Sequence, residues 1–204
     1  MGRSAMNGKA IAPPRIYFIR HGETAWSLSG KHTGRTDLPL TEQGERDARS
    51  LAGRLRAVEF GSVFTSPMAR ARRTCKLAGL IDGAVISSDL VEWEYGDYEG
   101  KRPEYIRKER PNWTIFRDGC PNGESPTQVC GRADRLIKLL RKLEGNIALF
   151  SHGQFGRVFG ARWIGAPVSQ AQHFLLGTAS LSILGFEHDR ADTPAIVLWN
   201  AAAN

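Results

Sequence analysis

Residues 16–24 read IYFIRHGET, an apolar run that leads directly into an arginine, a histidine and a glycine. β-Branched and aromatic residues bounded by Pro14 and Gly22 are typical of a short buried strand. Arg20 and His21 are then expected at the carboxyl end of that strand, where open α/β sheets bind their ligands. This stretch predicts a ligand site at one edge of a sheet.

The same arrangement occurs at residues 147–153, IALFSHG, where an apolar run leads into Ser151, His152 and Gly153. A helical pattern follows this second histidine. If the two strands lie parallel in one sheet, His21 and His152 face each other across a cleft at its edge.

Strand and helix patterns alternate through the rest of the chain. Further strands are predicted at residues 62–65, 85–86, 179–186 and 195–199, and helices after Thr41, over 68–78, 102–110 and 125–143, and from 153 to about 164. Residues 25–40 and 111–123 are expected to be irregular, the second as a loop that covers a cleft. The alternation indicates an α/β fold, a three-layer α/β/α sandwich with a mostly parallel central sheet. We expect a single domain over residues 15–204 behind a disordered leader at 1–14.

With 204 residues, 41% hydrophobic and 24% charged, the chain has the composition of an ordinary globular protein. No apolar run approaches the ~20 residues of a membrane span and no signal-peptide pattern opens the chain, so a cytoplasmic protein without a membrane is expected. Cys75, Cys120 and Cys130 are odd in number and lack the Cys-x-x-Cys spacing. They are expected as free thiols rather than as disulfides or zinc ligands.

A net charge of +7 favours an anionic partner. No block of Lys and Arg is interleaved with aromatic residues, which argues against nucleic acid and favours a small phosphorylated substrate. Other basic residues, among them Arg132 and Arg135, are expected on a solvated helix surface. The oligomeric state stays open, a homo-oligomer included.

Arg70 lies in the first turn of the helix expected after the N-cap Ser66, where a cation opposes the helix dipole unless an anion is bound there. A phosphate would remove this conflict, because helix N-termini and arginines both bind phosphate oxygens. Together with Arg20, His21 and His152, Arg70 gives two arginines and two histidines at strand ends, without a thiolate or carboxylate cluster. Such a set resembles an oxyanion site more than a metal site.

This set suits phosphoryl transfer. A neutral imidazole can attack phosphorus, and Arg20 and Arg70 would lower the pKa of His21 by disfavouring the imidazolium. The same arginines would stabilise the equatorial oxygens of the transferring group. An acid must protonate the leaving alkoxide, and the acid-rich candidate is the segment around Glu92, where a carboxylate enclosed by aromatic rings would have a raised pKa.

Four motifs, in this order, resemble those of the histidine phosphatase superfamily, which includes the cofactor-dependent phosphoglycerate mutases. The motifs are Arg20-His21-Gly22-Glu23-Thr24, Ser66-Pro67-x-x-Arg70-Ala71-x-x-Thr74, Leu90-x-Glu92 with Tyr95-Gly96 and Glu99-Gly100, and Ser151-His152-Gly153. The resemblance spans about residues 15–200 and implies a phosphoglycerate mutase-like fold.

The resemblance also implies a role for each matched residue. His21 is the implied nucleophile, which forms a phosphohistidine, and Glu92 is the implied proton donor and later the base for water. Arg20, Arg70 and His152 form the implied phosphate pocket. The other positions implied to contact substrate are Ser27, Thr33, Gly34, Tyr95, Gly153 and Gln154. No metal and no cofactor are implied.

Two departures separate the chain from the mutases. Many relatives have Asn at the position of Ser27, so a phosphate contact is either lost or made by a shorter hydroxyl. The segment between Glu92 and His152 is also shorter than in the mutases, which close an insertion over phosphoglycerate. A phosphatase is therefore favoured over a mutase. Residues 26–34, 93–100 and 113–124 are similar to a branch that includes sedoheptulose bisphosphatases, which implies a sugar phosphate or bisphosphate as substrate.

Three alternatives stay open. A cofactor-dependent phosphoglycerate mutase would need a bisphosphorylated primer and would move phosphate without releasing it. A non-catalytic phosphoester-binding module would bind esters without forming a phosphoenzyme. A metal hydrolase that uses His21 and His152 would be sensitive to chelators.

Overall fold

The computed structural model describes residues 13–203. The leader predicted over residues 1–14 lies, except for its last two residues, outside the described residues. The strands are β1 (Arg15–Arg20), β2 (Phe60–Thr65), β3 (Val85–Ile86), β4 (Asn146–Ser151), β5 (Leu181–Phe186) and β6 (Pro194–Ala201). The α-helices are α1 (Ala25–Leu28), α2 (Glu42–Leu55), α3 (Ala69–Leu77), α4 (Pro103–Glu109), α5 (Ile115–Asp118), α6 (Pro126–Leu140) and α7 (Gly153–Trp163). Short 3₁₀ helices span Ser88–Leu90, Gly96–Tyr98, Val168–His173 and Glu187–Asp189.

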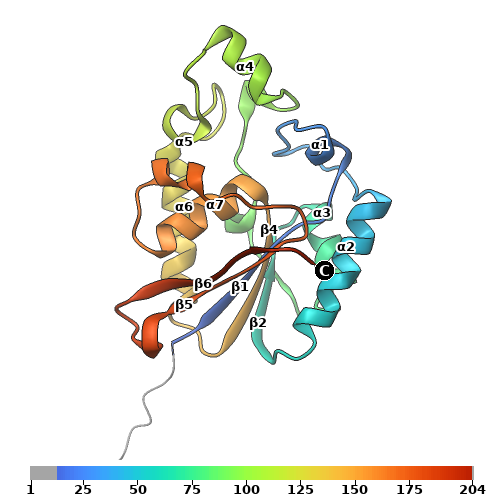
Figure 1. The fold of residues 1–204 in the computed structure, drawn as a ribbon, viewed down its shortest axis with the longest axis vertical. Helices are drawn as coiled ribbons and strands as arrows, with labels where there is room; N and C mark the ends of the chain where they lie inside the picture. The colour runs from blue at the N-terminus through green and yellow to red at the C-terminus, as the bar shows by residue number, and fades with distance from the viewer. Residues whose placement is uncertain (1–12, 204) are drawn as a thin grey trace, which may run out of the picture.

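One sheet of six strands, in the order β3-β2-β4-β1-β5-β6, forms the centre of the molecule (Figure 1). The strands β3, β2, β4 and β1 pair in parallel, whereas β5 pairs antiparallel with both of its neighbours. In the ladder of β1 and β4, Arg20 lies opposite Ser151. The histidine that follows each strand therefore leaves the same edge of the sheet, and the predicted mostly parallel α/β sheet is confirmed.

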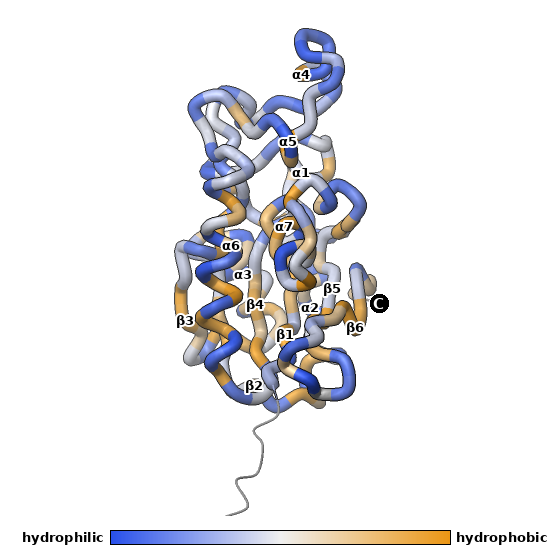
Figure 2. The backbone as a smooth tube through the Cα atoms, turned by 90° about the vertical axis from the view of Figure 1, so that its left-hand side faces the viewer, coloured by the Kyte–Doolittle hydropathy of each residue, from blue (hydrophilic) through white to orange (hydrophobic). Residues whose placement is uncertain are grey.

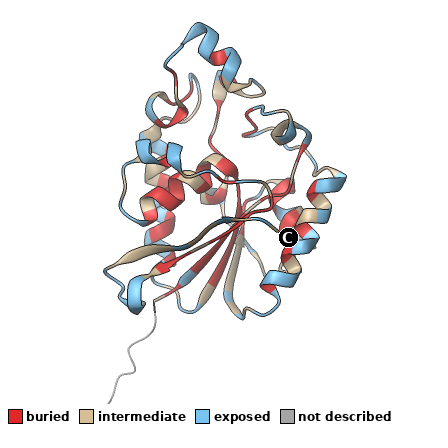
Figure 3. Ribbon diagram, in the orientation of Figure 1, coloured by how far each residue is buried: buried red, intermediate tan, exposed pale blue. Residues whose placement is uncertain are grey.

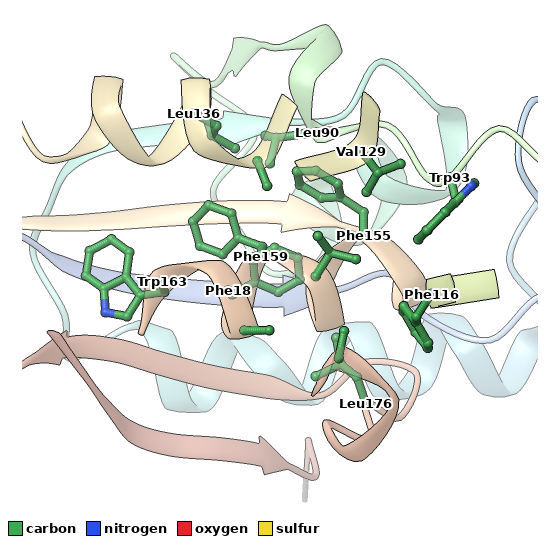
Figure 4. Close-up of a cluster of buried hydrophobic side chains, with 14 of the residues drawn as sticks. Phe18, Leu90, Trp93, Phe116, Val129, Leu136, Phe155, Phe159, Trp163 and Leu176 are labelled. Carbon is green, nitrogen blue, oxygen red and sulfur yellow. The ribbon is translucent and has the colours of Figure 1, made fainter. Parts of the chain in front are cut away.

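Helices cover both faces of the sheet, as the alternation of β1 requires. Ile16 and Phe18 join a core cluster with α6 and α7, whereas Tyr17 and Ile19 join a second cluster with α2 and α3. Figure 1 shows these helix pairs on opposite sides of the sheet. In the larger cluster, the ring of Phe18 stacks on that of Phe159 in α7 with centroids 5.5 Å apart (Figure 4). Both faces of the central strands are buried, which fixes the register of β1.

The helices α1, α4 and α5 lie beyond the carboxyl ends of the parallel strands, at the top of Figure 1. The chain around α4 is largely hydrophilic (Figure 2) and mostly exposed (Figure 3). The segment 111–123, predicted to be irregular, contains α5 and packs four side chains into the larger core cluster, Trp113, Ile115, Phe116 and Cys120. This segment is therefore part of the folded core at the end of the sheet where the site is expected.

Two local predictions were wrong. Helix α3 begins at Ala69 rather than Met68, and Ser66 is not its N-cap. The carboxylate of Asp37 instead accepts from the backbone N–H of Ala69, with both oxygens within 3.0 Å. Residues 25–40, expected to be irregular, contain α1, which is stabilised by a capping box between Thr24 and Ser27. The predicted caps of the longer helices, Thr41 for α2 and Ser125 for α6, are confirmed.

Arg132 also differs from its prediction, because it is buried rather than solvated, with 6% of its surface exposed. It lies on the inner face of α6, between Val129 and Leu136. Its charge is compensated by the Glu124 carboxylate at 2.7 Å. Its guanidinium also donates to the carbonyl oxygens of Val91 and Glu92, so α6 holds the segment that carries the candidate acid.

No helix in the described part of the chain, residues 13–203, has the length and apolar character needed to cross a membrane.

We predict that two glycines of the same helix respond in opposite ways to alanine. A Cβ at Gly44, in the first turn of α2, would lie 2.2 Å from the carbonyl oxygen of Glu23, whereas a Cβ at Gly53 would meet nothing within 4 Å. Gly44→Ala is expected to cost about 2 kcal/mol or more through overpacking, and Gly53→Ala to gain about 0.5–1 kcal/mol of helix stability. Urea unfolding of both variants measures this. Equal free energies of unfolding would contradict the close approach of α2 to the turn after β1.

Candidate active site

His21 is buried at the end of β1, with 4% of its surface exposed. Its Nδ1 lies 2.7 Å from the carbonyl oxygen of Gly22. The backbone N–H of Gly22 donates to the hydroxyl of Thr74 at 3.0 Å, and that hydroxyl donates to the carbonyl oxygen of Arg70. Helix α3 thus fixes the turn that orients the histidine.

The contact with Gly22 sets the tautomer of His21. Because a carbonyl oxygen can only accept, Nδ1 carries the proton and Nε2 carries the free lone pair. Burial, together with the guanidinium groups of Arg20 and Arg70, lowers the pKa of His21 well below its ordinary value. The imidazole is therefore neutral at pH 7, the form that can act as a nucleophile.

His152 is fully buried directly before α7, and its ring lies 5.2 Å from that of His21, centroid to centroid. The Nε of Arg70 donates to its Nδ1 at 3.2 Å, so the neutral ring carries its proton on Nε2 and donates to the hydroxyl of Ser66 at 2.8 Å. Burial and Arg70 lower the pKa of His152 well below its ordinary value. The two histidines meet at the edge of the sheet as predicted, but their rings are in direct contact and do not face each other across a cleft.

Arg70 is fully buried and ties the loop after α1 to the histidine pair. Its terminal nitrogens donate to the carbonyl oxygens of three residues of that loop, Thr33, Gly34 and Thr36. Asp37 lies 3.7 Å away. The anion that balances Arg70 at the start of α3 is therefore a side chain of the protein, although the sequence suggested a bound phosphate.

Arg20 is held by the carbonyl oxygen of Leu176. Its Nε is buried and finds no acceptor among the described residues. A Cβ at Gly153 would lie 3.1 Å from the guanidinium carbon of Arg20, so glycine is needed here for close contact with the cation. A buried N–H without an acceptor suits a phosphate oxygen.

Glu92 is buried against the start of α7, with 7% of its surface exposed. One carboxylate oxygen accepts from the backbone N–H groups of Trp93 and Phe155 at 2.9 and 2.8 Å. The other accepts from that of Gln154 at 3.0 Å. This carboxylate, expected within an aromatic enclosure, is thus held by backbone donors at the positive end of a helix dipole.

A cleft of about 180 Å³ brings most of the predicted residues together. The predicted residues that line it are Arg20, His21, Ser27, Thr33, Glu92, Tyr95, Gly153 and Gln154. Arg70, His152 and Gly34 do not line it, because they form the layer of contacts behind His21. The cleft is therefore built from the ends of β1 and β4, the loop after α1 and the segment that follows Glu92.

Several of the predicted substrate-binding residues also have structural partners. The hydroxyl of Ser27 donates to the carbonyl oxygen of Thr24, and the N–H of Gly34 donates to the Glu99 carboxylate. The ring of Tyr95 is 2% exposed and stacks on His32 with centroids 4.3 Å apart. Burial, followed by the nearby Glu92, raises the pKa of Tyr95 well above its ordinary value, so its hydroxyl stays protonated.

Six further residues that were not predicted also line the cleft: Gly30, Lys31, His32, Pro103, Arg157 and Leu176. Arg157 could have been found, because it lies one helical turn after Gly153 on α7 and so shares its face. Gly30, Lys31 and His32 lie in the loop after α1. This loop has no helical or strand periodicity from which the direction of its side chains could be predicted.

Groups of three or more His, Cys, Asp or Glu side chains suited to a metal ion do not occur within residues 13–203.

The fold and the site define a class of α/β proteins that present a buried, neutral histidine beside arginines at the carboxyl edge of a mixed sheet. The chain belongs to the histidine phosphatase superfamily, branch 1, whose family model matches residues 16–202. The predicted family is confirmed.

Three comparisons show the extent of the similarity. The chain is 43% identical to an acid phosphatase of Mycobacterium tuberculosis over 179 residues, 85% of this chain and 87% of the relative. It is 34% identical to the sedoheptulose 1,7-bisphosphatase of Saccharomyces cerevisiae, and the match covers 91% of this chain and 92% of the relative. A solved structure of the product of a Mycobacterium tuberculosis open reading frame superposes with a TM-score of 0.87 at 36% identity and covers 93% of this chain and 98% of its own. These matches also confirm the predicted class of enzyme, a phosphoric monoester hydrolase of this superfamily.

We predict that His32 makes the protein sensitive to acid. Burial, followed by Arg107, lowers the pKa of His32 from 6.5 to about 4. Between these values the unfolded chain binds the proton that the folded protein excludes, so this contribution to stability is lost as the pH falls. At roughly 1.4 kcal/mol per pKa unit, the loss at pH 4.5 is on the order of 2–3 kcal/mol. His32→Phe keeps an aromatic ring at this position but cannot bind a proton. The free energy of unfolding of this variant should therefore fall less between pH 7 and pH 4.5.

Urea unfolding at pH 7 and pH 4.5 measures the difference. The control is His173→Phe at an exposed histidine, which should behave as the native protein does. An equal loss of stability in native protein and His32→Phe would show that His32 is not buried in its neutral form.

Proposed function

We propose that the protein is a metal-independent phosphatase that hydrolyses small phosphate monoesters through a phosphohistidine on His21. The observation that carries the proposal is the setting of His21: neutral, with Nδ1 bound to the Gly22 carbonyl, in a cleft shared with Arg20 and Glu92. Sugar phosphates or bisphosphates are the proposed substrate class. The name of the yeast relative, a sedoheptulose 1,7-bisphosphatase, supports that class.

In the first step, Nε2 of His21 attacks phosphorus. The N–P bond forms as the ester P–O bond breaks, while Nδ1–H stays bonded to Gly22 and stabilises the positive charge that develops on the ring. Arg20 offers its unpartnered Nε–H to the phosphoryl oxygens. Arg70 and His152, one layer further back, add positive potential and hold the ring of His21 in place.

Glu92 handles the proton in both steps. Its carboxyl group, in the lining of the cleft, protonates the departing alkoxide oxygen. In the second step it takes a proton from water as the water oxygen attacks phosphorus. The N–P bond then breaks, inorganic phosphate leaves, and His21 returns to its neutral form. The backbone donors of α7 keep the carboxylate in one orientation throughout.

We further propose that the remaining predicted residues contact substrate. Ser27, Thr33, Tyr95, Gly153 and Gln154 line the cleft around His21 and would contact the bound ester, its phosphate included. Gly34 acts one layer back, because its carbonyl oxygen accepts from Arg70.

A cytoplasmic location and one domain over residues 15–204 belong to the same proposal. The three cysteines are free thiols, as a reducing compartment would keep them. Burial raises the pKa of Cys75 and Cys120 to about 12, so both stay protonated and unreactive.

His21→Ala is expected to lower phosphate release by several orders of magnitude, because it removes the Nε2 that attacks phosphorus. Phosphate release from sugar phosphates and 3-phosphoglycerate is measured with a chelator present, and the phosphoenzyme is trapped by an acid quench. The control is His173→Ala, at an exposed histidine outside the cleft. Turnover retained in His21→Ala would contradict the mechanism. Phosphate transfer to 3-phosphoglycerate without release would indicate a mutase instead.

Glu92→Gln should affect substrates according to their leaving groups. An alkoxide leaving group depends on the proton of Glu92, so hydrolysis of a sugar phosphate should fall about a hundredfold or more, whereas p-nitrophenolate needs little protonation. The ratio of kcat/KM for the two substrates measures this. Glu94→Gln, two residues away and outside the lining of the cleft, is the control. Equal losses on both substrates in Glu92→Gln would exclude Glu92 as the acid.

A further inference from the structure

A second cavity of about 320 Å³ adjoins the cleft of His21. The two share four lining residues, His32, Pro103, Gln154 and Arg157. The other walls of the second cavity come from Arg107 on α4, the segment 113–116 and Gln172. We call this cavity the distal chamber. A ligand in the cleft of His21 would therefore lie next to the distal chamber.

The lining of the distal chamber carries two arginines and no carboxylate. Arg157 donates to the carbonyl oxygens of Ala171 and Gln172 and to the side-chain oxygen of Gln154, and lies over the ring of Phe116, 4.7 Å from its centroid. Among residues 13–203, Arg107 donates only to the carbonyl oxygen of Trp113, at 3.4 Å. Neither guanidinium lies within 4 Å of a carboxylate among the described residues. Each arginine has five N–H donors, so donors remain for a ligand.

His32 lies at the junction of the two cavities and is 6% exposed. Its ring is held between Tyr95, stacked at 4.3 Å, and the edge of Trp113 at 5.8 Å. In residues 13–203, only two buried side-chain polar atoms lack a partner, Nε2 of His32 and Nε of Arg20. Arg20 lines the cleft of His21, and His32 lines both cavities. A buried polar atom without a partner is costly, and a ligand atom that pairs with it removes the cost.

We propose that the distal chamber binds a second phosphate group of the substrate, so that the enzyme selects bisphosphate esters over the corresponding monophosphates. Arg107 and His32 are the residues that determine this preference, and Arg157 contributes charge from the shared wall. The inference rests on the proposed function, because the reacting phosphate is placed at His21. The distal chamber would bind a second phosphate group, in addition to the reacting phosphate at His21.

The test compares two esters, fructose 1,6-bisphosphate and fructose 6-phosphate, whose affinities are measured by calorimetry on full-length His21→Ala, which does not consume them. In this background the bisphosphate should bind at least about tenfold more tightly. Adding Arg107→Gln should lower the ratio of the two affinities about tenfold. The matched control is Lys108→Gln, which removes a charge from the same helix but outside the chamber, and should keep the ratio.

His32→Phe provides a second variant, because it keeps the aromatic stack and removes both ring nitrogens. It should lower the same ratio and leave the helix α4 intact. Should His21→Ala not fold, the ratio of kcat/KM for the two esters gives the same comparison in protein that retains His21.

Equal affinity for the two esters would overturn the inference, and so would an equal ratio in Arg107→Gln and Lys108→Gln. Failure of the proposed function has a different signature, namely no phosphate release from either ester by native protein. Binding of the bisphosphate that depends on Arg107, without any release, would support the chamber and contradict the phosphatase.

Discussion

Arg20 and Ser151 lie opposite each other in the parallel ladder of β1 and β4, and the active site depends on this register. It places His21 and His152 one residue beyond the same edge of the sheet, with their rings in contact. Because side chains alternate along a strand, a slip by one residue would turn the apolar residues of β1 away from their helices. The core on both faces of the sheet therefore maintains the geometry of the site.

The layer behind the histidines is held by polar contacts that are nearly all satisfied. Arg70 connects His152 to three carbonyl oxygens of the loop after α1, so one buried cation orients the histidine and the wall of the cleft. Arg132 likewise holds the segment that carries Glu92, because it donates to the carbonyl oxygen of Glu92. Its charge is balanced by Glu124. Removing one of these partner groups by mutation would leave a buried charge uncompensated. The charges of this layer are paired by carbonyl groups and carboxylates of the protein.

Much of this arrangement could be predicted where the signals are local. The strand that ends at Arg20, the caps at Thr41 and Ser125 and the motifs around the two histidines are all short-range patterns, and the structure confirms the elements. Ser66 was predicted to be a helix cap, but its hydroxyl forms a hydrogen bond with His152, which is 86 residues away in the sequence. Arg132 was misread for the same reason, since its counter-charge and carbonyl partners lie outside α6. Tertiary partners of a polar side chain leave no periodic pattern in the sequence.

The two unpartnered atoms show how the cleft differs from the layer behind it. Buried polar atoms in proteins are nearly always hydrogen-bonded, because an unpaired one lowers stability. Here the exceptions in the described chain are a guanidinium N–H beside His21 and a ring nitrogen of His32 at the entrance to the distal chamber. Both residues line a cavity, and the arginines nearby set a positive potential. An anionic ligand with one group in each cavity would complete the hydrogen bonding that the protein itself leaves incomplete, so the cost in stability is offset when substrate binds.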